Sequence, residues 1–112
     1  YLGDGWLGTY EEDQLLLESE RNVPAETTSA IAEVVAEMNR QRELWGEQNH
    51  NPHIYMNILF EEVGEAAQAL NEFYFKKEPK ELEHLREELV QTAAVAISIV
   101  ECIDRDKWVR SK

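Results

Sequence analysis

Apolar residues recur at helical spacing in three segments of this chain, and no segment alternates apolar and polar residues as a β-strand does. Glycine and proline separate the segments, and these residues end helices. We therefore predict an all-α fold, an antiparallel bundle of three main helices. The predicted helices run from a cap at Asn22 to Gly46, from His53 or Ile54 to Lys76, and from Pro79 to Asp104 or Lys107.

Each predicted helix carries an apolar stripe that can pack against the other helices. In the first helix the stripe consists of Ile31, Val34, Val35, Met38 and Leu44-Trp45. The second is predicted to bury Ile58, Leu59, Val63, Ala66, Ala67, Leu70 and Phe73, and the third Leu82, Leu85, Leu89, Ala93, Ala96, Ile97, Val100 and Ile103. A chain of 112 residues builds only a small core from such helices. We therefore expect a homodimer or a homotetramer arranged as a dimer of dimers.

Residues 1–21 differ in composition from residues 22–112, which we expect to form the helical domain. Thr9 and Glu12 match a capping box, which predicts a short helix. Trp6 and the nearby leucines favour an acidic and apolar arm that docks on the domain or on a neighbouring subunit; a disordered tail is the alternative. Because the chain begins with Tyr1 rather than Met, we expect upstream residues or a processed start.

The charge balance excludes several classes of partner. The chain has 23 acidic and 11 basic residues and a net charge of -12, which argues against a surface for nucleic-acid phosphates. No apolar stretch approaches the roughly 20 residues that span a bilayer. The single cysteine, Cys102, cannot form an internal disulfide. We expect a cytoplasmic protein that binds neither nucleic acid nor membrane.

Two acidic patterns lie on the second and third predicted helices, Glu61-Glu62-Val63-Gly64-Glu65 and Glu87-Glu88-Leu89-Val90-Gln91. Residues three apart share one side of a helix, so Glu62 with Glu65 and Glu88 with Gln91 each present two oxygen ligands. Antiparallel packing would bring the two pairs together. Three carboxylates and an amide suit Mg²⁺. The alternative is a pair of ordinary solvated helix faces in a chain rich in glutamate.

These patterns resemble the signature of the MazG-like nucleotide pyrophosphohydrolases, in the all-α NTP pyrophosphatase superfamily. That signature is two Glu, two variable residues and Glu, then a spacer, then Glu, two variable residues and Asp. Glu61, Glu62 and Glu65 match its first half and Glu88 its third ligand, while Gln91 stands where the family usually has Asp. The resemblance covers about residues 31–105. It implies Mg²⁺, or Mn²⁺ as a substitute, on Glu62, Glu65, Glu88 and Gln91.

The resemblance also implies an activity, the hydrolysis of a nucleoside triphosphate between its α and β phosphates to give a monophosphate and pyrophosphate. The substrates would be standard or damaged nucleotides, and the role control of the nucleotide pool. Glu61 is the candidate to orient or deprotonate the attacking water, unless it is only a solvated neighbour.

The segment between the first two helices is rich in amides and imidazoles, and it resembles the nucleoside-facing region of that family. Trp45 can stack on a base while Gln48, Asn49 and His50 donate or accept hydrogen bonds. The alternative is that Trp45 closes the core and the asparagines form turns. A zinc pair of His50 and His53 lacks further ligands at suitable spacing.

Lys76 and Arg105 are the candidates to bind the triphosphate, although such residues more often complement helix ends or surface acids. Two other functional classes stay open. Gln91 in place of Asp is compatible with a catalytically inactive helical interaction module. Glu81 and His84 have the Glu-x-x-His spacing of di-iron bundles, but only one copy exists.

Overall fold

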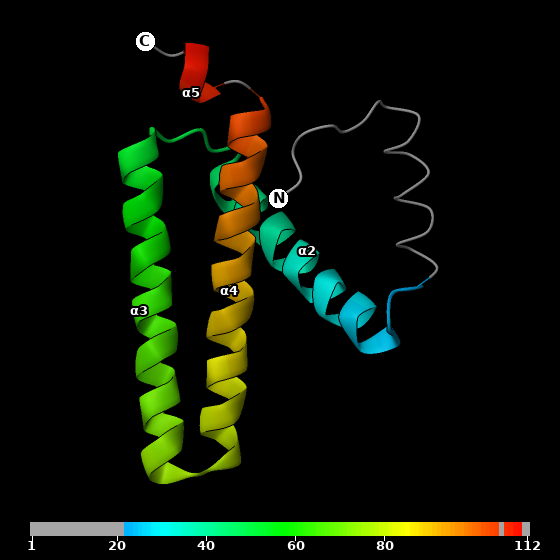
Figure 1. Ribbon diagram of the computed structural model, residues 1–112, viewed down its shortest axis with the longest axis vertical. Coiled ribbons are helices and arrows are strands. Elements are labelled where there is room, and N and C mark those ends of the chain that lie inside the picture. Colours follow the sequence, from blue (N-terminus) through cyan, green and yellow to red (C-terminus); the bar gives the residue numbers. More distant parts are fainter. Residues whose placement is uncertain (1–21, 106, 111–112) are drawn as a thin grey trace.

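The computed structural model describes residues 22–105 and 107–110. It contains the helices α2 (Ala25–Trp45), α3 (Pro52–Lys76), α4 (Pro79–Asp104) and the short α5 (Lys107–Arg110), and no strand among the described residues (Figure 1). The prediction of an all-α fold is confirmed. The predicted arm, with its short helix, lies outside the described residues. None of the helices in the described part of the chain combines the length and the apolar character that crossing a bilayer requires.

The helix ends follow the local signals in the sequence. Asn51 caps α3, because its side-chain oxygen accepts a hydrogen bond of 3.0 Å from the backbone N–H of Ile54. Gly46, with φ 73°, ends α2 in a conformation that glycine adopts readily. At the start of α2 the cap position belongs to Pro24 rather than to the predicted Asn22, so this helix begins at Ala25.

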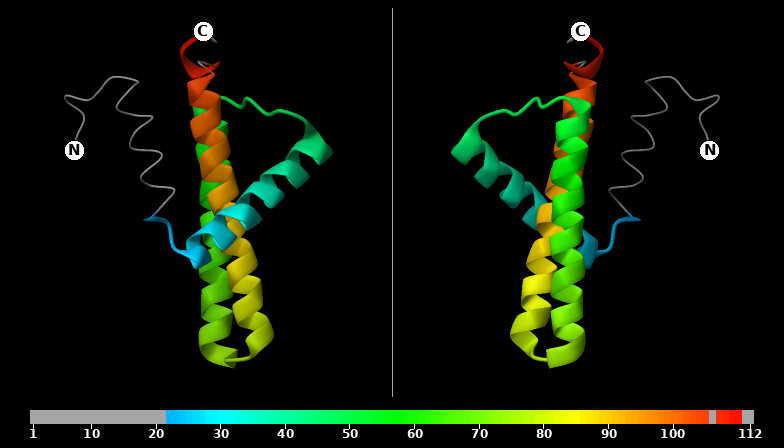
Figure 2. Two further views of the ribbon diagram at one scale, coloured as in Figure 1. Left: turned by 90° about the vertical axis from the view of Figure 1, so that its right-hand side faces the viewer. Right: turned by 90° about the vertical axis from the view of Figure 1, so that its left-hand side faces the viewer.

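The helices α3 and α4 form an antiparallel hairpin, and α2 crosses α4 obliquely on one side of it (Figures 1 and 2). Two ion pairs join α2 to α4, Arg86 with Glu33 at 2.6 Å and Arg42 with Glu101 at 3.1 Å. Both pairs are largely exposed, and exposed pairs stabilise a fold by about 1 kcal/mol or less. The position of α2 therefore depends mainly on its buried apolar contacts.

Those contacts form two small clusters that share α4. Tyr55 of α3 packs with Val95, Ile99 and Cys102 of α4. Val34 and Met38 of α2 pack on Ala94, which is 0% exposed. An alanine at this contact lets the two helix backbones approach closely.

Several residues predicted to lie in the core are exposed. In α2 only Val34 and Met38 of the predicted stripe are buried. Of the residues predicted to be buried in α3, only Ala66 is buried, while Ile58, Leu59 and Phe73 are half-buried. The exposed residues that the prediction placed inside are Val63, Ala67 and Leu70 of α3 and Leu82, Leu89, Ile97, Val100 and Ile103 of α4. The prediction was wrong for these because α3 and α4 meet along neighbouring, smaller residues. A hairpin with one further helix leaves the bulkier stripe uncovered.

The packing of α2 predicts the effect of a larger side chain at residue 94. Ala94→Leu should lower the free energy of unfolding by about 1–3 kcal/mol, because the close contact with Val34 and Met38 has no room for three more carbons. Urea unfolding followed by circular dichroism measures this change. Ala32→Leu, at an exposed position of α2, is the matched control and should change stability by less than about 0.5 kcal/mol. Equal midpoints for the two variants would contradict the packing.

Candidate metal centre

Three carboxylates from two helices meet between α3 and α4. Glu62 and Glu65 come from α3 and Glu88 from α4, and one oxygen of each lies within 4.8 Å of the others. Ala66 and Ala69 are buried on the same helix beside these glutamates. Such small side chains let α4 approach α3 closely. The acids therefore lie near one another because the helices pack tightly there.

Two of the three carboxylates are partly removed from solvent, whereas Glu65 is exposed. Glu88 is 9% exposed and Glu62 is half-buried. One oxygen of each, Oε1, is buried without a hydrogen-bond partner. A buried acceptor without a partner costs about 1–3 kcal/mol, and more when it is charged. A cation or a bound proton at these oxygens would lower that cost.

Burial and mutual repulsion both shift the titration of the cluster. Burial raises the pKa of Glu62, and the charges of Glu65 and Glu88 raise it further. Burial is also the main cause that raises the pKa of Glu88, and its hydrogen bond with Glu65 raises that pKa further. Among the described residues, the only basic side chain within 4.0 Å of a cluster carboxylate is His84, whose Nε2 lies 4.0 Å from Glu88 Oε2. No lysine or arginine in that part of the chain neutralises the three acids at contact distance.

The other two predicted members of the site lie next to the cluster. Gln91 is half-buried, about one turn beyond Glu88 on α4. Glu61 is exposed, and its charge is among those that raise the pKa of Glu62. Its position beside the cluster is compatible with contact to a water molecule.

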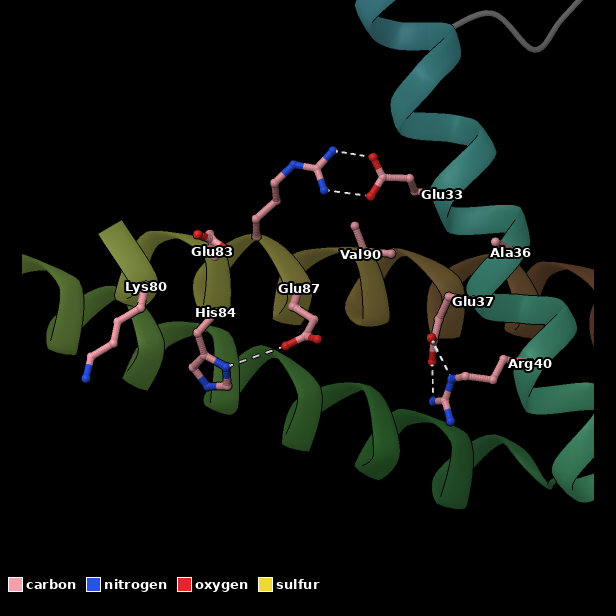
Figure 3. Close-up of a pocket in the computed structure, with 10 residues that line it drawn as sticks. Glu33, Ala36, Glu37, Arg40, Lys80, Glu83, His84, Glu87 and Val90 are labelled. Carbon is pink, nitrogen blue, oxygen red and sulfur yellow. Dashed lines mark hydrogen bonds and ion pairs between the residues drawn. The ribbon is translucent and has the colours of Figure 1, made fainter. Parts of the chain in front are cut away.

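A fourth acid, Glu37 of α2, was not predicted. Arg40 donates two hydrogen bonds to its carboxylate, at 2.9 and 2.7 Å (Figure 3). Gln41 donates a third at 2.8 Å. The bond from Arg40 lowers the pKa of Glu37, whereas the charge of Glu37 raises the pKa of Glu62. The spacing of Glu37, Arg40 and Gln41 predicts a local ion pair. Its approach to Glu62 depends on how α2 crosses the hairpin, which no local pattern encodes.

A cleft of about 270 Å³ adjoins the carboxylate cluster, and Glu62 forms part of its wall. Its lining residues are Gln41, Trp45, Gln48, His50, Tyr55, Ile58, Glu62, Val95 and Ser98. Three of the residues predicted to contact a nucleoside, Trp45, Gln48 and His50, therefore lie together beside the acids. Trp45 is 59% exposed, so its ring does not close the core.

The loop before α3 is held by its backbone rather than by its cleft-lining side chains. Tyr55 donates a hydrogen bond of 2.9 Å to the carbonyl of Gln48, and Trp108 donates one of 3.0 Å to the carbonyl of His50. Arg105 donates to the side-chain oxygen of Asn49 at 3.0 and 2.8 Å. These bonds fix the loop while leaving the side chain of Gln48 on the wall of the cleft.

The remaining predicted substrate residues lie elsewhere. Asn49 and Arg105 bind each other, and neither lines the cleft. Lys76 lies at the far end of the hairpin, where its Nζ is 3.9 Å from Glu81. Eleven residues separate Lys76 from Glu65, which is roughly 16 Å along a helix.

A larger hollow, of about 690 Å³, separates α2 from α4 farther along the hairpin (Figure 3). Its bases are Arg40, Lys80, His84 and Arg86, and its acids are Glu33, Glu37, Glu83 and Glu87. Arg86 binds Glu33 and Arg40 binds Glu37 with both carboxylate oxygens. Their charges are thereby balanced, so this hollow is not a strongly positive surface for phosphate.

Comparison of the chain with models of protein families, with curated proteins and with solved structures gave no match. The functional argument therefore depends on the geometry of the site.

The electrostatics of the cluster predict how metal-free protein responds to pH. Glu88→Gln should stabilise it by about 1 kcal/mol at neutral pH, because one charge disappears and the new amide can donate to Glu65. The pKa values of Glu62 and Glu88 are raised in the folded state, so their ionised carboxylates destabilise the folded wild-type protein. This destabilisation is fully present at pH values above the folded-state pKa values, and it disappears as the pH falls through them towards the ordinary value of 4.5. The advantage of the variant should therefore shrink on acidification.

Urea unfolding in the presence of a chelator, at a series of pH values, measures this difference. Glu83→Gln on the exposed side of α4 is the control for a general loss of charge. A constant difference across the pH series would contradict the assigned repulsion.

Proposed function

We propose that the protein is a Mg²⁺-dependent nucleoside triphosphate pyrophosphohydrolase of MazG-like type, releasing a monophosphate and pyrophosphate. One observation carries the proposal. Three carboxylates, of which Glu62 and Glu88 each have a buried oxygen without a hydrogen-bond partner, lie beside a cleft that contains Trp45, Gln48 and His50. A cation site and a slot for a planar ring are the two parts that such a reaction requires.

The donor atoms of the cluster suit a hard cation. Glu62, Glu65 and Glu88 would hold Mg²⁺, or Mn²⁺ in its place, with the amide oxygen of Gln91 as a further ligand. Once bound, the ion would neutralise phosphate charge and favour the attacking water. The same ion would satisfy the partnerless oxygens of Glu62 and Glu88, which supports its presence on physical grounds.

The protein's own residues would orient the substrate. Trp45 stacks on the base, and Gln48 and His50 form hydrogen bonds to its edge or to the sugar. Because Glu62 borders both the cleft and the cluster, a nucleoside in the cleft places its α phosphate next to the carboxylates. Glu61, exposed beside them, orients or deprotonates the water.

An inactive interaction module is the second candidate function. Gln91 supplies one negative charge less than the Asp of the family pattern, which weakens cation binding. The di-iron alternative has less support. Glu81 is paired with Lys76, and among the described residues the clustered acids do not include Glu81 or His84.

Loss of a single cluster carboxylate tests the proposed activity. Glu62→Gln or Glu65→Gln should reduce Mg²⁺-dependent pyrophosphate release to the level without metal, because the cluster then loses a charged ligand. The assay uses a panel of nucleoside triphosphates, and circular dichroism verifies the fold. Glu83→Gln, a loss of charge outside the cluster, should retain activity. Wild-type turnover by both cluster variants would refute the proposal, and an inactive wild type would favour the interaction module.

The cleft makes a separate kinetic prediction. Trp45→Ala should raise KM by roughly tenfold or more, because stacking of a base on an aromatic ring contributes about 1–3 kcal/mol, while kcat changes little if stacking is equal in the ground and transition states. Trp45→Phe keeps a stacking ring and should restore most of the affinity. Steady-state kinetics on the preferred nucleotide distinguish these cases. An unchanged KM for Trp45→Ala would place the nucleoside outside this cleft.

A further inference from the structure

A hollow of about 290 Å³ adjoins the carboxylate cluster between α3 and α4, and we call it the hairpin hollow. Its lining residues are Glu65, Gln68, Ala69, Glu72, His84 and Glu88. It shares no residue with the cleft that contains Trp45 and Glu62. The cluster is therefore bordered by two separate spaces, the cleft at Glu62 and the hairpin hollow at Glu65 and Glu88.

The residues of the hairpin hollow come from the facing sides of two antiparallel helices. Glu65, Ala69 and Glu72 share one side of α3, because they are four and three residues apart. His84 and Glu88, which are four residues apart, share one side of α4. Since the helices run in opposite directions, residues after Glu65 lie opposite residues before Glu88 (Figure 1). The hollow therefore extends from the cluster towards the turn that joins the two helices.

The two ring nitrogens of His84 face different acids. Nδ1 lies 3.8 Å from Glu87 Oε1 (Figure 3), and Nε2 lies 4.0 Å from Glu88 Oε2. A carboxylate beside one ring nitrogen favours the tautomer that carries its proton there, which leaves a lone pair on the other nitrogen. The exposed Glu87 is placed to favour the proton on Nδ1. Nε2, beside Glu88 in the hairpin hollow, is then the nitrogen that can bind a metal ion.

The distance between His84 Nε2 and Glu88 Oε2 is close to that of two ligands on one ion. Bonds from Zn²⁺ to nitrogen or to oxygen are about 2.0–2.2 Å long, so two ligands at the tetrahedral angle lie roughly 3.4 Å apart. The observed distance is 4.0 Å, and the side chain of His84 is 48% exposed. A small rotation of this side chain is therefore enough to bring both atoms onto one ion.

Glu88 gives an independent indication of a bound cation. It is 9% exposed, it lines the hairpin hollow, and its Oε1 is buried without a hydrogen-bond partner. Leaving a charged acceptor in this condition costs more than leaving a neutral one, and coordination to a cation offsets the cost.

We infer that the hairpin hollow binds a divalent transition-metal ion, represented by Zn²⁺, with His84 Nε2, Glu88 and Glu65 as its ligands. Three protein ligands and a water molecule are a usual set for Zn²⁺, and the volume of the hollow leaves room for the water. Glu72, half-buried on the wall of the hollow, adds a further negative charge near the ion.

The imidazole distinguishes this position from the proposed Mg²⁺ position. Imidazole nitrogen suits Zn²⁺ and related ions, whereas Mg²⁺ prefers ligands that are all oxygen. The inference does not rest on the proposed hydrolase activity, because it concerns a different ion and requires neither Glu61 nor the cleft.

Isothermal titration calorimetry of Zn²⁺ into the full chain, freed of metal by a chelator, tests the inference. Wild-type protein should bind one Zn²⁺ per chain in the hairpin hollow. His84→Asn should weaken this binding by about tenfold or more, since even the outer partners of metal ligands contribute about ten- to hundredfold. His53→Asn removes another exposed histidine, one that does not line the hollow, and as the matched control it should keep the wild-type affinity.

Nitrogen NMR of the histidine rings identifies the ligand in wild-type protein, so the test does not depend on a variant alone. Zn²⁺ should shift the Nε2 resonance of His84, assigned by its loss in His84→Asn, and leave those of His50 and His53 in place. Mg²⁺ alone should leave all three in place, because it prefers oxygen ligands.

Three outcomes would overturn the inference. They are no binding of Zn²⁺ by wild-type protein, an affinity that His84→Asn leaves unchanged, and a Zn²⁺-induced shift confined to His50 or His53. None of them bears on the proposed hydrolase, whose test is pyrophosphate release with Mg²⁺. Equally, a chain without hydrolase activity would leave a Zn²⁺ shift at His84 as support for the inference.

Discussion

The close packing of α3 on α4 is the constraint on which the rest of this structure depends. Ala66 and Ala69 permit the approach, and the same approach holds Glu62 and Glu65 within 4.8 Å of Glu88. Like charges at such distances repel, and the partial burial of Glu62 and Glu88 reduces screening by water. The packed hairpin therefore holds three negative charges close together, and a positive charge beside them would lower their repulsion. The described part of the chain supplies only His84 near these acids, at 4.0 Å from one of them.

The helix α2 forms one wall of the cleft next to these carboxylates. Its packing on Ala94 places Gln41 and Trp45 across from Glu62, and the loop that follows is fixed by Tyr55 and other donors to its backbone. Hydrogen bonds to the backbone of this loop leave its side chains free, whereas a side chain that holds the loop cannot also bind a ligand. Asn49 illustrates the point, since Arg105 occupies its oxygen. The cleft therefore combines polar groups and an aromatic ring next to unsatisfied carboxylates.

Local signals predicted the helices well and their buried sides poorly. Prolines, Gly46 and Asn51 act within a few residues, so they mark helix ends in the sequence. The acids were predictable as a pair because residues three apart share a helix side whatever the partner. Which apolar side is buried depends on the size of the facing residues. The bulkier residues Val63, Leu70 and Leu89 were assigned to the core but are exposed, whereas Ala66, Ala69 and Ala94 are buried. The approach of Glu37 to Glu62 depends on the crossing of α2, which sequence spacing does not specify.

The charged residues and the large apolar residues of α3 lie on different sides of the helix. One side carries the charged residues of the helix, and the apolar residues Met56, Phe60, Val63, Ala67, Leu70 and Tyr74 lie on the other. Repulsion between Glu62, Glu65 and Glu88 opposes the close packing of α3 on α4 when no cation is bound. The small core of one chain contributes little net free energy to offset that repulsion. The close packing of α3 on α4 therefore preorganises the carboxylates against this repulsion, and a preorganised cluster binds a cation more tightly than one that must first be assembled.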